Sequence, residues 1–327
     1  MTEPIRWGIL GTGLISGIFA KDLVENGFTI SAVGSRSQGS ADEFAATYGI
    51  ATAHASYEAL AEDPDVDVIY VGTPHPFHAE NATLALEHGK HVLVEKPFTI
   101  NAAEAASVVA LAEEKGLVVL EAMWTRWLPH VLRLREVIAA GTIGDVRTVI
   151  ADHNQSLPTD PAHRLNNPDL GGGALLDLGI YPVSFAWDIL GEPSSVYASS
   201  TPTATGVDQQ TAIVLGYESG AKALLHTALN TAGPNTASII GTNGWIEIAK
   251  TFYAPTTFTV YTTDGTVVET YTSEVSSRGM QFQAWEAERL IAAGSTAGDI
   301  LSPAETVGIM GTLDEVRRQI GLVYPGE

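Results

Sequence analysis

The sequence of 327 residues contains no cysteine. Disulfide bonds, thiolate catalysis and cysteine-ligated metal sites are therefore excluded. The nine histidines show no His-x-x-x-His spacing on an expected helix, so we expect no metal site. Basic residues are scarce too: 17 Lys and Arg stand against 38 Asp and Glu, a formal net charge of −21. Nucleic acids and anionic membranes bind basic surfaces, so neither is an expected partner.

Long apolar runs are missing as well, so we expect no segment that crosses a membrane. The first residues, Met1-Thr2-Glu3-Pro4, lack the basic and apolar regions of a secretory signal, so we expect a cytoplasmic protein. Hydrophobic residues make up 45% of the chain, which is enough for a sizeable core. The length indicates two domains, which we place at residues 1–122 and 123–327.

A glycine pattern lies near the start of the chain, between an expected strand, Ile5–Leu10, and an expected helix that reaches about Asn26. The segment Gly11-Thr12-Gly13-Leu14-Ile15-Ser16 fits the Gly-x-Gly-x-x-small turn that binds a dinucleotide. Gly11 allows the tight turn, and Gly13 lets backbone N–H groups approach a pyrophosphate at the positive end of the helix. Glycines at such a turn can also serve the turn alone, so the pattern needs support from the next strand.

That next strand, Thr29–Gly34, ends in Ser35-Arg36-Ser37. In an NAD-binding domain a carboxylate about 20 residues after the glycines binds the ribose hydroxyls. Here two hydroxyls flank a guanidinium, which suits a 2′-phosphate. The sequence therefore favours NADP over NAD, with Ser35 and Arg36 as ligands, and the alternative is an ordinary solvated arginine.

Alternating strand and helix patterns continue through the first domain and predict a doubly wound parallel Rossmann sheet. The further expected strands are Val66–Val71, His91–Pro97 and Val118–Glu121, and the helices are Ala41–Tyr48, Ser56–Ala61, His78–His88 and Asn101–Lys115. After Val71 the chain enters Thr73-Pro74-His75-Pro76-Phe77-His78 at the edge of the sheet where ligands bind. We expect Thr73, Pro74 and His78 to contact the cofactor, although the histidines fit equally well as turn and helix-start residues.

The strand beginning at His91 is apolar until it ends in two opposite charges, Glu95 and Lys96, followed by Pro97. A lysine at the low-dielectric end of a sheet is costly unless its charge is used. We therefore expect Lys96 to face the cofactor and a catalytic partner from another part of the chain, with Glu95 in the same site.

The second half begins with loops and contains one long apolar segment, Ala174–Leu190, which follows Gly171-Gly172-Gly173 and resembles a helix in its pattern. Asp177 and Tyr181 are four residues apart and share one face of it. Pro182 removes a helical hydrogen bond, so we expect a kink that re-aims Tyr181. On the residues alone, a capped aspartate and a core tyrosine of a buried helix explain the pattern as well.

The remainder is rich in expected strands, which makes this domain α+β with an open, mostly antiparallel sheet. The strands are Ile143–His153, Ser195–Ser200, Gln210–Tyr217, Ala221–Leu229, Ala237–Ile240, Trp245–Ala249, Phe258–Thr263 and Thr266–Tyr271, and two amphipathic helices follow, Gln281–Ala293 and Pro303–Ile320. One face of the sheet can pack on the apolar segment. The other needs a cover, and a second copy of the chain is the economical one.

Four residues are candidates for binding substrate: Trp124, Arg126, His163 and Arg164. The first two follow the last strand of the first domain, and an aromatic face suits the C–H face of a sugar ring or an arene. Plain packing explains a single tryptophan equally well. His163 and Arg164 precede the glycine run in a loop and can donate hydrogen bonds to substrate hydroxyls.

The motif Glu95-Lys96-Pro97 on a late strand of a dinucleotide-binding domain resembles the signature of the glucose–fructose oxidoreductase/inositol dehydrogenase (Gfo/Idh/MocA) family. Within that family, residues 121–129 and 310–327 resemble the branch of dimeric dihydrodiol dehydrogenases and NADP-dependent D-xylose dehydrogenases. The resemblance covers essentially the whole chain. It implies that Lys96 contacts the nicotinamide ribose and an acid–base residue, that the bond before Pro97 is cis, and that the C-terminal sheet forms a homodimer.

The same resemblance singles out Asp177-Leu178-Gly179-Ile180-Tyr181, because this branch has Asp-x-Gly-x-Tyr where many members have Asp-x-Gly-x-x-His. Oxidising an alcohol by hydride loss needs a base for the hydroxyl proton. We expect Tyr181 to be that acid–base residue, Lys96 to favour its phenolate form, and Asp177 to orient the sugar hydroxyls or the lysine.

The expected function is therefore an NADP-dependent oxidoreductase that acts on a cyclic polyol, an aldose or a trans-dihydrodiol. Two alternatives share the same fold. One is a non-catalytic NADP-binding sensor, which the joint presence of Lys96, Asp177 and Tyr181 disfavours. The other is a sugar transhydrogenase that holds its cofactor through successive turnovers, which predicts cofactor co-purifying with the protein.

Overall fold

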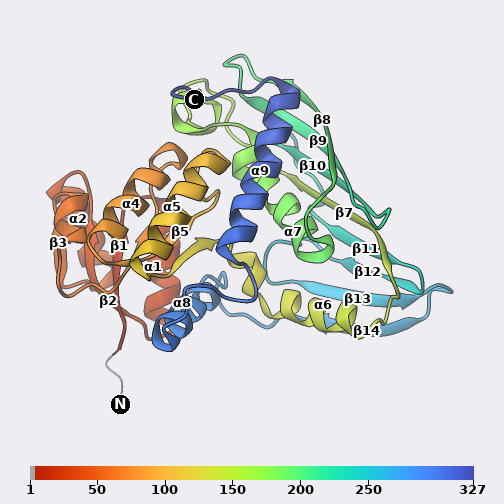
Figure 1. The fold of residues 1–327 in the computed structure, drawn as a ribbon, viewed down its shortest axis with the longest axis horizontal. Coiled ribbons are helices and arrows are strands. Elements are labelled where there is room, and N and C mark those ends of the chain that lie inside the picture. Colours follow the sequence, from red (N-terminus) through yellow and green to blue (C-terminus); the bar gives the residue numbers. More distant parts are fainter. Residues whose placement is uncertain (1–3) are drawn as a thin grey trace. The chain divides into compact units, whose positions relative to one another are not determined.

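The computed structural model describes residues 4–327, so the expectation for Met1, Thr2 and Glu3 lies outside the described residues. The chain forms two compact units (Figure 1). The first contains the chain up to Trp124 together with Ser277–Val307, and the second contains Thr125–Ser276 and Gly308–Glu327. The segment Ser277–Val307 thus packs with the first unit, whereas the sequence assigns it to the second domain. The roles expected for the two domains, dinucleotide binding for residues 1–122 and substrate binding with dimerisation for residues 123–327, stay predictions.

The first unit is built on a six-stranded parallel sheet in the order β3-β2-β1-β4-β5-β6. Its strands are β1 (Arg6–Leu10), β2 (Thr29–Gly34), β3 (Thr52–His54), β4 (Val68–Val71), β5 (His91–Glu95) and β6 (Val119–Ala122). The expected doubly wound sheet is confirmed. The chain switches direction across the sheet between β1 and β4, and ligands bind beyond the carboxyl ends of the strands at such a point.

Helices connect these strands: α1 (Leu14–Glu25), α2 (Gln38–Tyr48), α3 (Tyr57–Ala61), α4 (His78–Glu87) and α5 (Ala102–Lys115). The Asn101 side chain accepts a hydrogen bond from the Glu104 amide at 2.9 Å at the start of α5, and Gly116 ends that helix at a φ of 64°. The buried Asp22 of α1 accepts the amides of Gly279 and Met280 at 3.1 and 2.9 Å. Asp22 thereby fixes the segment that leads into α8 (Gln281–Ala293) to the first unit.

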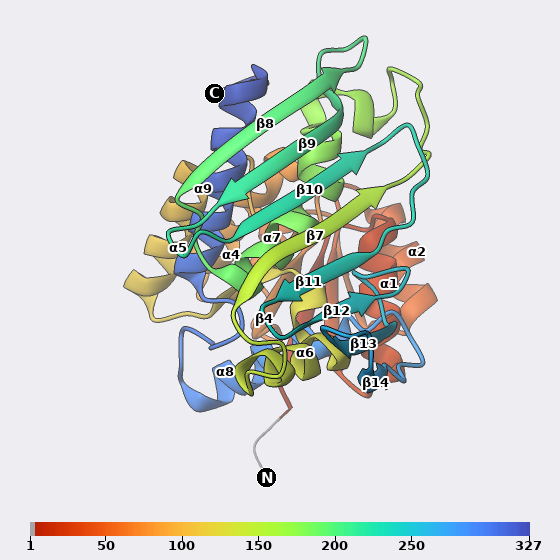
Figure 2. The same ribbon diagram turned by 90° about the vertical axis from the view of Figure 1, so that its right-hand side faces the viewer.

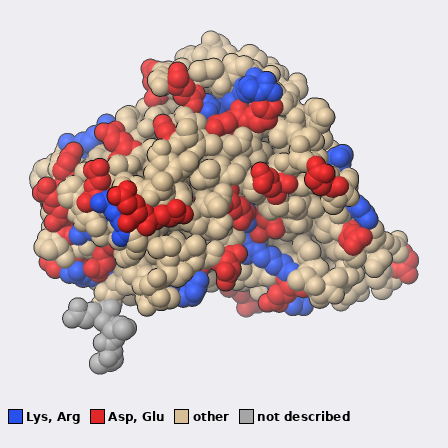
Figure 3. Space-filling model, viewed as in Figure 1, with Lys and Arg blue, Asp and Glu red and all other residues tan. Residues whose placement is uncertain are grey.

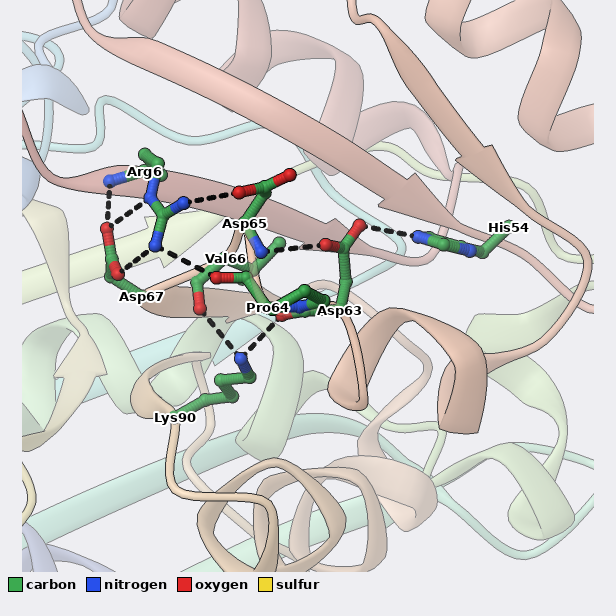
Figure 4. Close-up of polar contacts among 8 residues, drawn as sticks. All are labelled: Arg6, His54, Asp63, Pro64, Asp65, Val66, Asp67 and Lys90. Atoms are coloured by element: carbon green, nitrogen blue, oxygen red, sulfur yellow. Dashed lines mark hydrogen bonds and ion pairs between the residues drawn. The ribbon is translucent and has the colours of Figure 1, made fainter.

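A polar network closes the amino ends of β1, β4 and β5 (Figure 4). The Arg6 guanidinium pairs with Asp67 at 2.8 Å and with Asp65 at 2.7 Å. The ammonium of Lys90, which is largely buried, donates to the carbonyls of Asp63 and Val66 at 2.6 and 2.8 Å, and burial lowers the pKa of Lys90. Because these groups lie at the ends of the strands opposite the ligand edge, we assign the network to stability.

The second unit is built on an eight-stranded sheet in the order β14-β13-β12-β11-β7-β10-β9-β8 (Figure 2). Its strands are β7 (Val146–Asn154), β8 (Ser195–Pro202), β9 (Asp208–Gly216), β10 (Lys222–Ala228), β11 (Ala237–Gly241), β12 (Gly244–Ile248), β13 (Thr257–Thr262) and β14 (Val267–Thr272). All eight expected strands are confirmed. The sheet is antiparallel except between β7 and β10, which run parallel. β10 pairs with one edge of β7 and β11 with the other.

The apolar segment before residue 190 is not one regular helix. It consists of a π-helical turn, Leu175–Gly179, followed by α7 (Ile180–Leu190), and both pack on strands of the sheet. The amide of Ile180 reaches back to the carbonyl of Leu175, which places the irregularity before Pro182 rather than at it. Two further helices complete the unit: α6 (Pro129–Ala139), which the sequence analysis missed, and α9 (Pro303–Ile320), which begins in the first unit.

One segment of the described chain, Pro168–Leu190, is long and apolar enough by length and composition to cross a membrane, contrary to the expectation from sequence. Within its most apolar window 83% of the residues are buried in the protein. A helix that forms the core of a sheet-based unit meets the same criterion. The expected cytoplasmic location stays a prediction.

Candidate active site

The turn after β1 has the geometry that the glycine pattern predicts. Gly11 has a φ of +96°, and a Cβ there would lie 3.1 Å from the carbonyl oxygen of Gly72. Gly13 precedes α1, and no side chain caps the first turn of this helix. The side chain of Ser16 is fully buried, and a Cβ on Gly72 would collide with its hydroxyl. The free amide groups of the first turn of α1 are therefore available to an anionic group.

Beside the end of β2 lies an open cavity of about 750 Å³, which is within the usual range for small-molecule sites. Its lining comes from the loop after β2, from α3, from the loop after β4 and from α4; the lining residues include Arg36, Ser56, Tyr57, Glu58, Thr73, Pro74, Phe77, Glu80, Asn81 and Glu87. Both Arg36 and Tyr57 line this cavity; burial raises the pKa of Tyr57, and the positive charge of Arg36 opposes that shift. The hydroxyl of Ser35 lies 3.3 Å from that of Thr12, which links this loop to the glycine turn.

Acidic side chains predominate on the face shown in Figure 3, in agreement with the net charge of −21. Three glutamates, Glu58, Glu80 and Glu87, line the cavity itself. An anionic ligand must therefore be held by local donors against the general field of the protein. In this cavity Arg36 is the guanidinium that can serve such a ligand.

Two buried side chains, Glu95 and His78, position the chain around Lys96 at the carboxyl end of β5. On one side, the buried carboxylate of Glu95 accepts a hydrogen bond from the Tyr70 hydroxyl at 2.6 Å and from the Lys96 amide at 3.2 Å. Burial raises the pKa of Glu95. The Lys96–Pro97 peptide bond that follows is cis, as expected. Because the Glu95 carboxylate accepts the Tyr70 hydroxyl, the structure gives Glu95 an anchoring role. Its contact with the cofactor stays a prediction.

His78 supplies the second anchor. It is fully buried, and its two ring nitrogens each lie 2.8 Å from a carbonyl oxygen, those of Thr73 and Pro97. Burial lowers the pKa of His78, and the charge of Lys96 adds to this effect. The ring therefore joins the loop after β4 to the loop after β5. The contact of His78 with the cofactor stays a prediction.

In the second unit, the structure brings two predicted site residues together. Both terminal nitrogens of Arg164 lie 3.2 Å from one carboxylate oxygen of Asp177. Asp177 is largely buried in the π-helical turn, whereas the Arg164 side chain is about half exposed and can still reach a ligand. The His163 ring accepts the amide of Leu165 at 3.3 Å and so shapes the same loop.

Tyr181 lies in a cluster of aromatic rings that the sequence analysis did not identify. Its ring centroid is 5.0 Å from that of His153 on β7 and 5.2 Å from that of Tyr253, and these two stack on each other at 3.8 Å. The side-chain amide nitrogen of Gln155 lies 2.8 Å from Nε2 of His153. The Tyr181 ring is thus fixed on two sides. Tyr253 follows β12 in a loop without periodicity, so no sequence signal pointed to it.

The predicted substrate residues Trp124 and Arg126 are both buried. In the first unit, the Arg278 guanidinium lies 4.9 Å from the Trp124 ring centroid. In the second, Arg126 is 2% exposed and binds Asp188 of α7 at 2.9 Å and the Ser184 hydroxyl at 2.9 Å. This ion pair holds the segment after Trp124 on α7, so it gives Arg126 a structural role. The predicted contacts of both residues with substrate stay predictions.

The class of protein follows from these features and from comparison with known proteins. Residues 5–123 match the oxidoreductase family with an NAD-binding Rossmann fold. Residues 131–247 match the GFO/IDH/MocA C-terminal domain. Together they define an NAD(P)-dependent oxidoreductase of two domains.

Individual relatives agree along nearly the whole chain. A trans-1,2-dihydrobenzene-1,2-diol dehydrogenase of Xenopus laevis is 34% identical, with 98% of this chain and 99% of that protein covered. A D-xylose 1-dehydrogenase (NADP(+)) of Hypocrea jecorina is 35% identical, with 98% and 93% covered. Among solved structures, the 3-ketoreductase KijD10 of Actinomadura kijaniata in complex with NADP and TDP-benzene is 26% identical, with a TM-score of 0.87 and 97% and 98% covered. The chain therefore belongs to the Gfo/Idh/MocA family of oxidoreductases.

Proposed function

We propose that this oxidoreductase uses NADP and transfers a hydride between the nicotinamide and a CH–OH group of an aldose, a cyclic polyol or a trans-dihydrodiol. The observation that carries the cofactor assignment is the cavity beside β2. The strand is followed by Ser35-Arg36-Ser37 instead of an acidic residue, and Arg36 lines the cavity. An NADP-dependent xylose dehydrogenase and an NADP-bound ketoreductase among the similar proteins support it.

The assignment of Arg36 predicts a selective loss. Arg36→Ala should raise the KM for NADP about tenfold to hundredfold, because a charged hydrogen bond is worth about 1.5–3 kcal/mol. The KM for NAD should change by less than about twofold, since NAD lacks the 2′-phosphate. Initial rates with both cofactors, at saturating D-xylose and at a saturating trans-dihydrodiol, check this.

The matched control is Arg318→Ala, which removes the same charge from the exposed surface of α9. It should leave both KM values unchanged. Equal losses for NADP and NAD in Arg36→Ala, or a wild-type enzyme that prefers NAD, would contradict the proposed role of Arg36.

For the chemistry, we assign Tyr181 as the acid–base residue, Lys96 as its electrostatic partner and Asp177 as the orienting carboxylate. A hydride leaving an alcohol carbon must be accompanied by loss of the hydroxyl proton, which Tyr181 accepts. The Asp177–Arg164 pair supplies a carboxylate and a half-exposed guanidinium for substrate hydroxyls. His163 lies in the same loop and is assigned to the same task.

The substrate class is supported by the rings around Tyr181. A sugar or dihydrodiol ring presents C–H groups, which pack well on aromatic faces, and hydroxyls, which need donors and acceptors. Tyr253 is only partly buried and can offer the ring face that is not stacked on His153, and Asp177 with Arg164 provides the polar groups. Dihydrodiol and xylose dehydrogenases among the relatives point to the same range of substrates.

We further propose a homodimer formed through the outer face of the eight-stranded sheet. Four cross-strand neighbours make an exposed apolar stripe there: Tyr197, Val214, Leu224 and Ile150. They belong to β8, β9, β10 and β7, which lie side by side in Figure 2. Such a stripe on one row of a sheet is the kind of surface that a second copy of the chain covers.

A charge in this stripe should break the dimer. Leu224→Lys is expected to shift the protein from dimer to monomer, because a buried unpaired ammonium is costly. Size-exclusion chromatography with light scattering measures the change. Val268→Lys on β14 makes a comparable substitution at an exposed residue outside the stripe and should leave the mass unchanged. A wild-type monomer, or a Leu224→Lys dimer, would exclude this interface.

A further inference from the structure

The last described segment, Leu322–Glu327, is fixed to α9 by Arg317. Two guanidinium nitrogens of Arg317 bind the two carboxylate oxygens of Glu327 at 2.6 and 2.8 Å. The guanidinium also lies 5.2 Å from the Tyr324 ring centroid, and the Tyr324 amide donates to Glu327 at 2.9 Å. Since Arg317 is 5% exposed, these contacts are shielded from water and hold the Tyr324 ring in one position.

The hydroxyl of Tyr324 reaches the glycine run that precedes the π-helical turn. It donates a hydrogen bond to the carbonyl oxygen of Gly172 at 2.6 Å, and the Tyr324 side chain is buried. A Cβ on Gly172 would lie 2.7–2.9 Å from the carbonyl oxygens of Leu165, Asn167 and Arg164. The run is therefore enclosed by the Arg164 loop on one side and is held by Tyr324 on the other.

A second buried group, Asp208, holds the chain just after the glycine run. One of its carboxylate oxygens accepts the Leu175 amide and the Thr211 hydroxyl, both at 2.8 Å. Leu175 is the first residue of the π-helical turn. The other oxygen faces Gly173, where a Cβ would collide with it. Burial raises the pKa of Asp208 to about 6, which marks how little water surrounds it.

We infer that Tyr324 and Asp208 are positioning residues for the active site proposed above. They fix the two ends of a short segment, Gly172 and Leu175, that connects the loop of Arg164 with the turn of Asp177. The Arg164–Asp177 pair and the start of the helix that carries Tyr181 depend on the place of this segment. The inference rests on the proposed function, since it assigns both residues to that site.

The energetics separate positioning from simple stabilisation. Tyr324→Phe removes one hydroxyl and keeps the ring, so the loss of stability should be only that of one hydrogen bond and one unpaired carbonyl. A shift of reacting groups of about 1 Å can cost about 100-fold in rate. The effect on turnover should therefore exceed what partial unfolding of the protein produces.

The experiment compares Tyr324→Phe and Asp208→Asn with Tyr217→Phe. Tyr217 is a matched control, because its hydroxyl is also buried in the second unit and has no hydrogen-bond partner within residues 4–327. We expect Tyr324→Phe to lower kcat tenfold or more with D-xylose or a trans-dihydrodiol. The dissociation constant of NADPH, measured by fluorescence titration, should stay within twofold. Tyr217→Phe should keep both values.

A second measurement does not depend on turnover. Hydrogen–deuterium exchange followed by mass spectrometry should show faster exchange in peptides covering residues 171–181 of Tyr324→Phe and Asp208→Asn, and no change there in Tyr217→Phe. If the wild-type protein turned over none of the substrates, the proposed function would fail while this measurement would still test the positioning. Unchanged exchange in residues 171–181 would overturn the inference. So would a kcat in Tyr324→Phe equal to that of Tyr217→Phe.

Discussion

Replacement of Tyr181 by phenylalanine is expected to lower kcat by about 10²–10⁴-fold, the range that a general acid–base residue contributes. The reduction should be the same with D-xylose and with a trans-dihydrodiol, because both reactions lose a hydroxyl proton. The dissociation constant of NADPH should stay within twofold. Steady-state kinetics and fluorescence titration on the same preparation measure the two quantities.

The surroundings of Tyr181 make this substitution a clean one. The side chain is 5% exposed, and its ring packs against His153 and Tyr253 at centroid distances of 5.0 and 5.2 Å. A phenylalanine ring fills the same space, so the only group lost is the hydroxyl. Tyr253→Phe is the matched control, since it removes a hydroxyl from the neighbouring ring and should keep kcat within a few-fold. A near-normal kcat in Tyr181→Phe would mean that another group takes the proton.

Much of the fold could be predicted from sequence because it follows local patterns. The helices α8 and α9 have the predicted bounds, Gln281–Ala293 and Pro303–Ile320, since their apolar residues repeat at the helical period and their ends are marked by glycine or proline. The eight strands of the second sheet were identified by alternation and hairpin turns. The strand β3 was missed, because three residues of mixed polarity carry no period.

The parts of the site that were missed depend on contacts between distant residues. Tyr324 and Gly172 are 152 positions apart, and nothing near either residue indicates the other. The π-helical turn adds a residue to a helical pattern that reads as continuous. Arg126 was predicted to contact substrate from its place after a strand, but its partner Asp188 lies 62 residues later on α7 and decides its environment. Sequence patterns point to the loops of the proposed site, and tertiary packing decides which side chains in them are exposed to a ligand.

Lys96→Met should have an effect second only to that of Tyr181→Phe, a loss in kcat of about 100-fold or more. A methionine keeps the length of the side chain and removes its charge. Because Glu95 is held by Tyr70 and the carbonyl of Pro97 lies 2.8 Å from the buried His78 ring, the backbone on both sides of Lys96 should keep its position. The measured loss then reports the charge that stabilises the phenolate, which in a site shielded from water is worth several kcal/mol.

Two further variants make this prediction specific. Lys115→Met removes an ammonium from the exposed last turn of α5 in the same unit and should keep kcat unchanged. Lys96→Arg keeps the charge but spreads it over a planar group of different reach, so it should recover only part of the activity. If Lys96→Met retained half of the wild-type kcat, the electrostatic role would be wrong. A wild-type protein that binds NADPH yet turns over no polyol, aldose or dihydrodiol would favour the sensor over the enzyme, since binding needs only the donors of the first unit whereas turnover needs the charge of Lys96 as well.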